Sequence, residues 1–66
     1  MQIELNGEAR EVAEGTTVAE LVAGLGLRPE VVAVELNRGL VRRDRRGDVR
    51  LAPGDRVEVV TLVGGG

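Results

Sequence analysis

The complete absence of aromatic side chains most constrains how this 66-residue chain can fold. A domain of this size buries only about 60% of the surface that its unfolded chain exposes, so its core must use small side chains efficiently. That core has to come from twelve valines, eight leucines and six alanines, together with Ile3 and Met1. Because β-branched side chains pack well on a pleated surface, the composition favours a small domain built around a sheet.

A hairpin is predicted at the N-terminus. Ile3 and Leu5 alternate with polar residues and lead into Asn6-Gly7. This dipeptide tolerates the positive φ angles of a type I′ turn better than other pairs do. The returning strand is expected to continue through residues 10–13.

A helix of about two to three turns is predicted after Gly15. Thr17-Val18-Ala19-Glu20 has the spacing of a capping box, in which the Thr17 hydroxyl and the Glu20 carboxylate each accept a backbone N–H of the other residue. Gly26 is placed to end the helix in a left-handed conformation. The apolar stripe of this helix is expected to comprise Val18, Leu21, Val22 and Leu25.

The second half of the chain reads as strands separated by turns. Pro29 requires an extended residue before it. Ala52-Pro53-Gly54-Asp55 is a strong turn signal, because proline presets one central φ angle and glycine accepts a positive one. The strands expected in this half are residues 31–36, 49–51 and 56–63.

Strand, strand, helix and three further strands suggest an α+β fold. If the last strand lies beside the first, the helix covers one face of a mixed sheet of four to five strands, which is the β-grasp or ubiquitin-like arrangement. We expect residues 1–63 to form this domain and residues 64–66 to form a flexible glycine tail.

The residue types argue against a self-sufficient enzyme. The chain has no Cys, His, Ser, Lys or Tyr, which removes most nucleophiles and general bases. No disulfide, metal site or bound cofactor is therefore expected. The N-terminal segment lacks a basic region and a long apolar run, so a cytoplasmic protein without membrane contact is predicted.

The charged residues do not indicate nucleic-acid binding. All nine cations are arginines, and eleven acidic residues bring the formal net charge to −2. The arginine-rich stretch 42–46 contains Asp44 and has no aromatic residue nearby to stack on a base. We interpret this stretch as a solvated loop rather than a contact for phosphate or an acidic partner.

The C-terminus is the candidate functional site. Gly64, Gly65 and Gly66 follow Val63 directly and run to the free carboxylate. Glycines cannot pack a core, but they can thread a narrow channel without side-chain clashes and adopt whatever φ and ψ angles a partner requires. Three extended residues reach about 10 Å. The Gly66 carboxylate is therefore expected to be the reactive group, although a disordered terminus or a cloning remnant would look similar.

A partner-binding surface is predicted beside this tail. Val60 and Leu62 alternate along the last strand and are expected on the sheet face away from the helix, where exposed apolar side chains can mark a contact site. Val31, Ala33 and Val63 complete the predicted patch. The alternative is that the inward and outward positions of the strand are assigned the wrong way round.

The residues resemble the ThiS family, the sulfur carriers of thiamine biosynthesis, over essentially the whole chain. The most specific piece is the ending from Glu58 to Gly66. Arg42 departs from the family pattern, because many relatives have proline there. The segments that carry the resemblance are the Asn6-Gly7 hairpin, Leu36-Asn37, Leu40-Val41-Arg42, Pro53-Gly54-Asp55-Arg56-Val57-Glu58 and Val59-Val60-Thr61-Leu62-Val63-Gly64-Gly65-Gly66.

This resemblance implies a carrier loaded by other proteins. A ThiF-type adenylyltransferase would use ATP and magnesium to convert the Gly66 carboxylate into an acyl-adenylate. A persulfide donor such as a cysteine desulfurase would supply sulfur, and a ThiG-type thiazole synthase would consume the resulting thiocarboxylate. Gly64, Gly65 and Gly66 would thread into the partner's active site.

Other functions stay open on the sequence alone. The molybdopterin-synthase small subunit resembles this chain too, although that family is usually longer and carries aromatic residues near its end. A sulfur carrier for another pathway, such as tRNA thiolation, is a further alternative. A ubiquitin-like modifier joined to lysines through Gly66 is a further alternative. The last alternative is a domain that binds a partner non-covalently and whose glycine tail has no role in binding.

Overall fold

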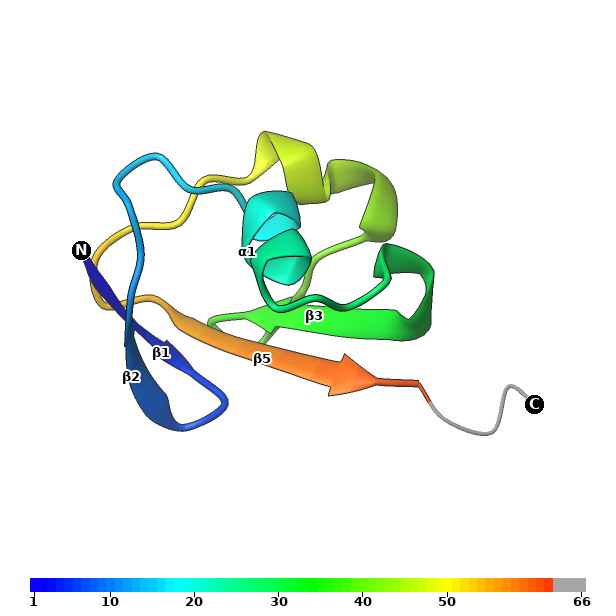
Figure 1. Ribbon diagram of the computed structural model, residues 1–66, viewed down its shortest axis with the longest axis horizontal. Coiled ribbons are helices and arrows are strands. Elements are labelled where there is room, and N and C mark those ends of the chain that lie inside the picture. The colour runs from blue at the N-terminus through cyan, green and yellow to red at the C-terminus, as the bar shows by residue number, and fades with distance from the viewer. Residues whose placement is uncertain (63–66) are drawn as a thin grey trace.

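The computed structural model describes residues 1–62, which form a five-stranded mixed sheet with one α-helix on one face (Figure 1). The strand order is β2-β1-β5-β3-β4, with β5 parallel to β1 and antiparallel to β3. The predicted α+β, β-grasp arrangement is therefore confirmed. The elements, including two 3-10 helices named η1 and η2, are β1 Gln2–Leu5, β2 Glu8–Glu11, α1 Val18–Gly24, η1 Pro29–Val31, β3 Val32–Leu36, β4 Gly39–Leu40, η2 Arg43–Asp48 and β5 Arg56–Thr61.

The predicted N-terminal hairpin forms at the predicted turn. Asn6 and Gly7 have φ angles of 51° and 84°, and the flanking strands pair from Leu5↔Glu8 to Gln2↔Glu11. All four residues of β2 are exposed, which is consistent with its place at the edge of the sheet. The turn chemistry thus fixes the register of the first two strands.

Helix α1 begins and ends where its capping residues predict. The Thr17 hydroxyl accepts the Glu20 N–H at 3.1 Å, and the Glu20 carboxylate accepts the Thr17 N–H at 2.8 Å. At the other end Gly26 has a φ angle of 76° and donates its N–H to the carbonyl of Ala23. This short helix therefore uses both predicted caps.

The core lies between α1 and the inner face of the sheet. Val18, Leu21 and Val22 of the helix are buried there, whereas Leu25 is only partly buried. The largest of the fully buried side chains are all β-branched, as the composition suggested. The fully buried side chains are Ile3, Val18, Val22, Val34 and Val57.

The prediction of a strand at residues 49–51 was wrong. This segment makes only an isolated bridge between Thr17 and Arg50, because its backbone pairs with the start of α1 and the loop before it. The Val18 N–H donates to the carbonyl of Val49, and the Leu51 N–H donates to the carbonyl of Thr16. The fourth strand of the sheet is instead β4, two residues after β3. Its turn holds Asn37 and Arg38 at positive φ angles of 51° and 73°.

The prediction that the whole arginine stretch is solvated was also wrong at one residue. Arg46 is only 5% exposed, while the other arginines of η2 are exposed. Its guanidinium donates to the carbonyl of Pro29 at 3.0 Å and to that of Val32 at 2.7 Å. Arg46 therefore connects η2 to the start of β3.

None of the helices that the structure describes in residues 1–62 is long enough and apolar enough to cross a membrane.

Candidate functional site: the end of β5 and the outer face of the sheet

The outer face of the sheet, which is the face away from α1, carries the described part of the predicted partner surface. Ala33 lies directly opposite Val60 in the antiparallel β3–β5 ladder, so their side chains share this face. Val60 and Leu62 are 56% and 57% exposed. The predicted outward orientation of these residues agrees with the register, and their role in binding a partner stays a prediction.

Val31 differs from the other described members of that surface. It ends η1 rather than lying in β3, and its partly buried side chain packs against the core. Its carbonyl, however, accepts the Leu62 N–H at 2.6 Å, which extends the β3–β5 pairing beyond the last regular strand residue. Val31 thus contributes mainly a backbone hydrogen bond to Leu62.

Leu40 belongs to the same face and was missed by the sequence analysis. It lies opposite Glu35 in the β3–β4 pairing and is 68% exposed. The missed strand β4 explains the omission. The signal that could have revealed β4 is the pair of adjacent apolar residues Leu40 and Val41, which face opposite sides of the sheet. Leu40 points to solvent, and Val41 is buried in the core.

Asn6 holds β5 at the point where β1 stops pairing with it. The last paired residues of these two strands are Leu5 and Val57. Beyond them, the Asn6 side chain accepts the Val59 N–H at 2.8 Å and donates to the Val59 carbonyl at 3.2 Å. One side chain therefore continues the backbone pairing of β1 along β5. The local sequence around Asn6 indicates only a turn residue.

Several contacts thus fix the path of the chain up to Leu62. Asn6 holds one edge of β5, and β3 holds the other. Arg46 in turn holds the carbonyl of Val32, the residue opposite Thr61. The strand that leads to the glycines is consequently anchored on both edges.

Glu35 and Glu58 form the most unusual pair on the outer face. They lie directly opposite each other in the β3–β5 ladder. Within residues 1–62, neither carboxylate has an arginine or amino nitrogen within 4.0 Å. The ion pair of this region joins Arg56 to the neighbouring Glu4 at 3.6 Å.

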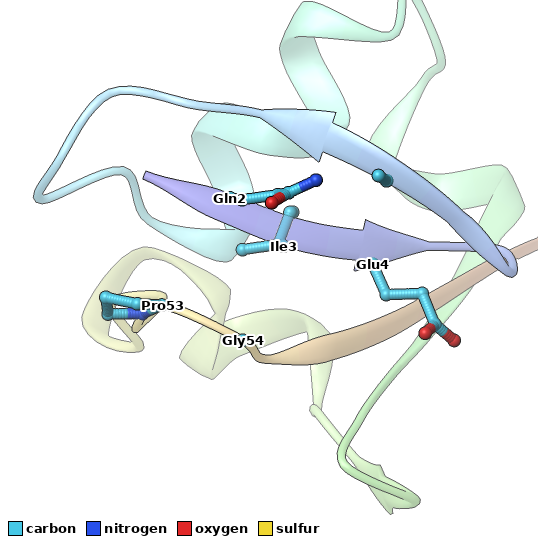
Figure 2. A pocket seen from close by; sticks show the side chains of 6 residues that line it. Gln2, Ile3, Glu4, Pro53 and Gly54 are labelled. Carbon is cyan, nitrogen blue, oxygen red and sulfur yellow. The ribbon is translucent and has the colours of Figure 1, made fainter.

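A shallow hollow on the outer face lies near the other end of β5. Figure 2 shows it over β1, beside the Pro53-Gly54 turn, with the Glu4 carboxylate pointing away from Pro53. The remaining lining residues are Gln2, Ile3 and Ala9. In the part of the chain that the structure describes, no cluster of three or more acidic residues is arranged to hold a metal ion.

The predicted carrier site itself, Gly64, Gly65 and Gly66, lies outside the described residues, as does Val63. What the structure provides is its immediate attachment, the anchored end of β5.

Comparison with known proteins decides the family. A model described as the ThiS family matches residues 3–66. The chain belongs to the ThiS family. This family comprises sulfur carrier proteins of thiamine biosynthesis, which are carriers rather than catalysts. The resemblance drawn from the terminal motif is therefore confirmed at the level of the family.

Individual relatives are of two kinds. The chain is 48% identical over 66 residues to a thiazole synthase of Magnetococcus marinus and 36% identical to one of Paramagnetospirillum magneticum, and it spans 20% of the length of each. It is also 34% identical to the sulfur carrier protein ThiS of Bacillus subtilis, covering 97% of this chain and 98% of that protein. Sequences similar to this chain thus occur both alone and as part of a larger protein.

Solved structures agree with the fold. The crystal structure of a thiamine biosynthesis protein (ThiS) from Geobacter metallireducens has a TM-score of 0.86 at 35% identity and covers 100% of both chains. A solution structure of a thiamine biosynthesis protein from the same organism has a TM-score of 0.83, covering 100% of this chain and 88% of that one.

Proposed function

We propose that this chain carries sulfur on its C-terminus for thiazole formation in thiamine biosynthesis. The observation that supports this most directly is the attachment of three glycines to an anchored strand in a member of the ThiS family. Because β5 is held up to Leu62, a partner can dock on a rigid body while the glycines enter its active site. The chemistry would take place at Gly66.

The first step would be activation of the Gly66 carboxylate by a ThiF-type adenylyltransferase. The carboxylate attacks the α-phosphorus of ATP with magnesium present, and pyrophosphate leaves. Activation is needed because a carboxylate is a poor electrophile, whereas the acyl-adenylate has AMP as a good leaving group. ATP and magnesium belong to the partner enzyme in this proposal.

The second step would load sulfur. The terminal sulfur of a persulfide, for example on a cysteine desulfurase, attacks the Gly66 carbonyl carbon and AMP leaves. A second thiol then cleaves the acyl disulfide, which releases the Gly66 thiocarboxylate and leaves a disulfide on the donor side. The two electrons come from two thiols of the donor proteins, the one that carried the persulfide and the one that cleaves the acyl disulfide, and these two end as a disulfide.

The acceptor would be a ThiG-type thiazole synthase. Support comes from the two relatives named thiazole synthase, in which a sequence similar to this chain makes up a fifth of the protein. A covalent link of that kind would keep the carrier next to the enzyme that uses its sulfur. All of these steps would occur in the cytoplasm, the location predicted from the sequence.

Intact-protein mass spectrometry tests the proposal. The chain is incubated with ATP, magnesium, an adenylyltransferase and a persulfide donor, and we expect the mass increase of an oxygen-to-sulfur exchange at Gly66. A chain with one residue appended after Gly66 is the matched control, and it should show no exchange while keeping its thermal stability. An unchanged wild-type mass, with enzymes that load a reference ThiS protein, would contradict the proposal.

A further inference from the structure

Glu35 and Glu58 place two like charges opposite each other on neighbouring strands. Like charges directly opposite each other on neighbouring strands repel, and this pair has no ion-pair partner within 4.0 Å in the described chain. Other residue types at these exposed positions would avoid the repulsion. Stability of the free domain therefore gives no physical reason for two carboxylates at these positions.

Apolar side chains border this acidic pair. Leu40 lies opposite Glu35, and Val60 follows two residues after Glu58 on the same face of β5. Ala33, opposite Val60, connects the two strands in the next row. The outer face thus presents two carboxylates next to the exposed apolar side chains of Leu40 and Val60, a combination that suits a protein contact rather than a solvated sheet.

Within the described residues, no arginine of this region forms an ion pair with Glu35 or Glu58. Arg56 contacts Glu4 at 3.6 Å. A second hollow, separate from the one beside Pro53, is lined by Glu4, Glu35, Arg38, Arg56 and Glu58. Arg38 borders it from the β3–β4 turn, but its guanidinium lies farther than 4.0 Å from the carboxylates of Glu35 and Glu58. Counting Glu4, Glu35 and Glu58 against Arg38 and Arg56, the hollow has three negative and two positive side chains.

We propose that this face docks the adenylating enzyme, which places an arginine or lysine side chain between Glu35 and Glu58 and covers Leu40 and Val60 with apolar side chains. The inference rests on the proposed function. Docking removes water from the carboxylates, which is unfavourable unless a cation replaces it, so an acidic or purely apolar partner surface is disfavoured. A guanidinium suits two facing carboxylates because its planar donors can bond to both.

The direction of β5 links this surface to the C-terminus. Glu58 and Val60 lie on the strand that leads to the glycines, and Leu62 continues it along β3. An enzyme that holds the tail must therefore lie next to the end of this strand. Contact with Glu58 and Val60 would orient the domain so that the tail points into the active site.

The test uses the charge-removing variants Glu35→Gln and Glu58→Gln, separately and together, in the full chain. Glu14→Gln is the matched control, because Glu14 is exposed in the loop before α1 and makes no ion pair within the described residues. Carrier-dependent release of pyrophosphate by the adenylyltransferase gives KM and kcat for each variant, and thermal unfolding gives Tm.

For the double variant we expect KM to rise about tenfold or more with little change in kcat, while Tm stays equal or increases. Opposite effects on recognition and on stability distinguish a docking role from a structural one. KM of the wild-type chain should also rise with salt, and this salt dependence should be smaller for the double variant. Arg38→Gln should leave KM unchanged or lower it, since Arg38 repels an incoming cation.

Three results would overturn the inference: a double-variant KM equal to that of Glu14→Gln, a fall in Tm that parallels the rise in KM, or weakened sulfur transfer to thiazole synthase with unchanged adenylation. The proposed function fails separately, when the wild-type chain is not adenylated at all.

Discussion

The two faces of one sheet differ sharply in this molecule. On the inner face Val34 lies opposite Val59, and both are buried beneath the helical layer. One residue further along β3 and one back along β5, Glu35 lies opposite Glu58 on the outer face, and both are exposed. The same two strands therefore pair aliphatic residues toward the core and like charges toward solvent.

This difference indicates how a 66-residue chain divides its tasks. Full burial of a valine or leucine contributes about 1.5 to 3 kcal/mol, so the inner face supplies most of the stability. Exposed side chains usually change stability by less than about 0.5 kcal/mol when replaced. The outer face is consequently free to carry residues that serve recognition, even at a small cost to the fold.

The largest contrast should come from truncating one side chain on each face. Leu21→Ala removes a helix side chain that is 4% exposed, and we expect it to lower the free energy of unfolding by about 2 to 5 kcal/mol. Val60→Ala on the outer face should change it by less than about 0.5 kcal/mol. Urea titration measures both, and similar losses for the two variants would show that the faces do not differ in this way.

The buried arginine sharpens the comparison, because it belongs to the covered side of the sheet although it is charged. Arg46→Ala leaves the carbonyls of Pro29 and Val32 without their donor, and we expect a loss of about 1 to 3 kcal/mol. Arg45→Ala is the matched control, since Arg45 is exposed and has only a 3.9 Å contact with Asp48. Equal unfolding free energies for the two variants would mean that the Arg46 contacts contribute nothing to stability.

The two asparagine turns provide a smaller test at the sheet edges. Asn6→Gly keeps a residue that accepts the positive φ angle but removes both bonds to Val59, so we expect a loss of about 1 kcal/mol and faster exchange of the Val59 amide hydrogen. Asn37→Gly, whose side-chain bonds are exposed, should lose less because water replaces them. Slower or unchanged exchange at Val59 in Asn6→Gly would refute the anchoring role.

The smallest effect is expected where this chain departs from the family pattern. Arg42 has φ and ψ angles of −61° and 146°, which proline can adopt, and its N–H makes no hydrogen bond to another described residue. Arg42→Pro should therefore raise the free energy of unfolding by about 0.4 to 1 kcal/mol by restricting the unfolded chain. A lower free energy of unfolding for Arg42→Pro, measured by urea titration, would point instead to a clash between the proline ring and Val41.

Local chemistry explains which parts of the fold the sequence determined. Asn6-Gly7, the Thr17–Glu20 capping box and the Pro53-Gly54 turn each fix a few consecutive dihedral angles, so they could be recognised without knowledge of the rest of the chain. The alternation of Val60 and Leu62 along the last strand likewise indicated which residues of β5 face away from the helix. The terminal motif indicated the family because it needs no tertiary context.

The tertiary structure decided the features that depend on register between distant segments. Residues 49–51 look like a strand, but their backbone partners lie in the loop before α1 rather than in the sheet. The burial of Arg46, the bonds of Asn6 to Val59 and the pairing of Glu35 with Glu58 all join residues that are far apart in the sequence. No local pattern specifies such pairs, because they arise only when the packing of α1 and the sheet sets which residues face one another.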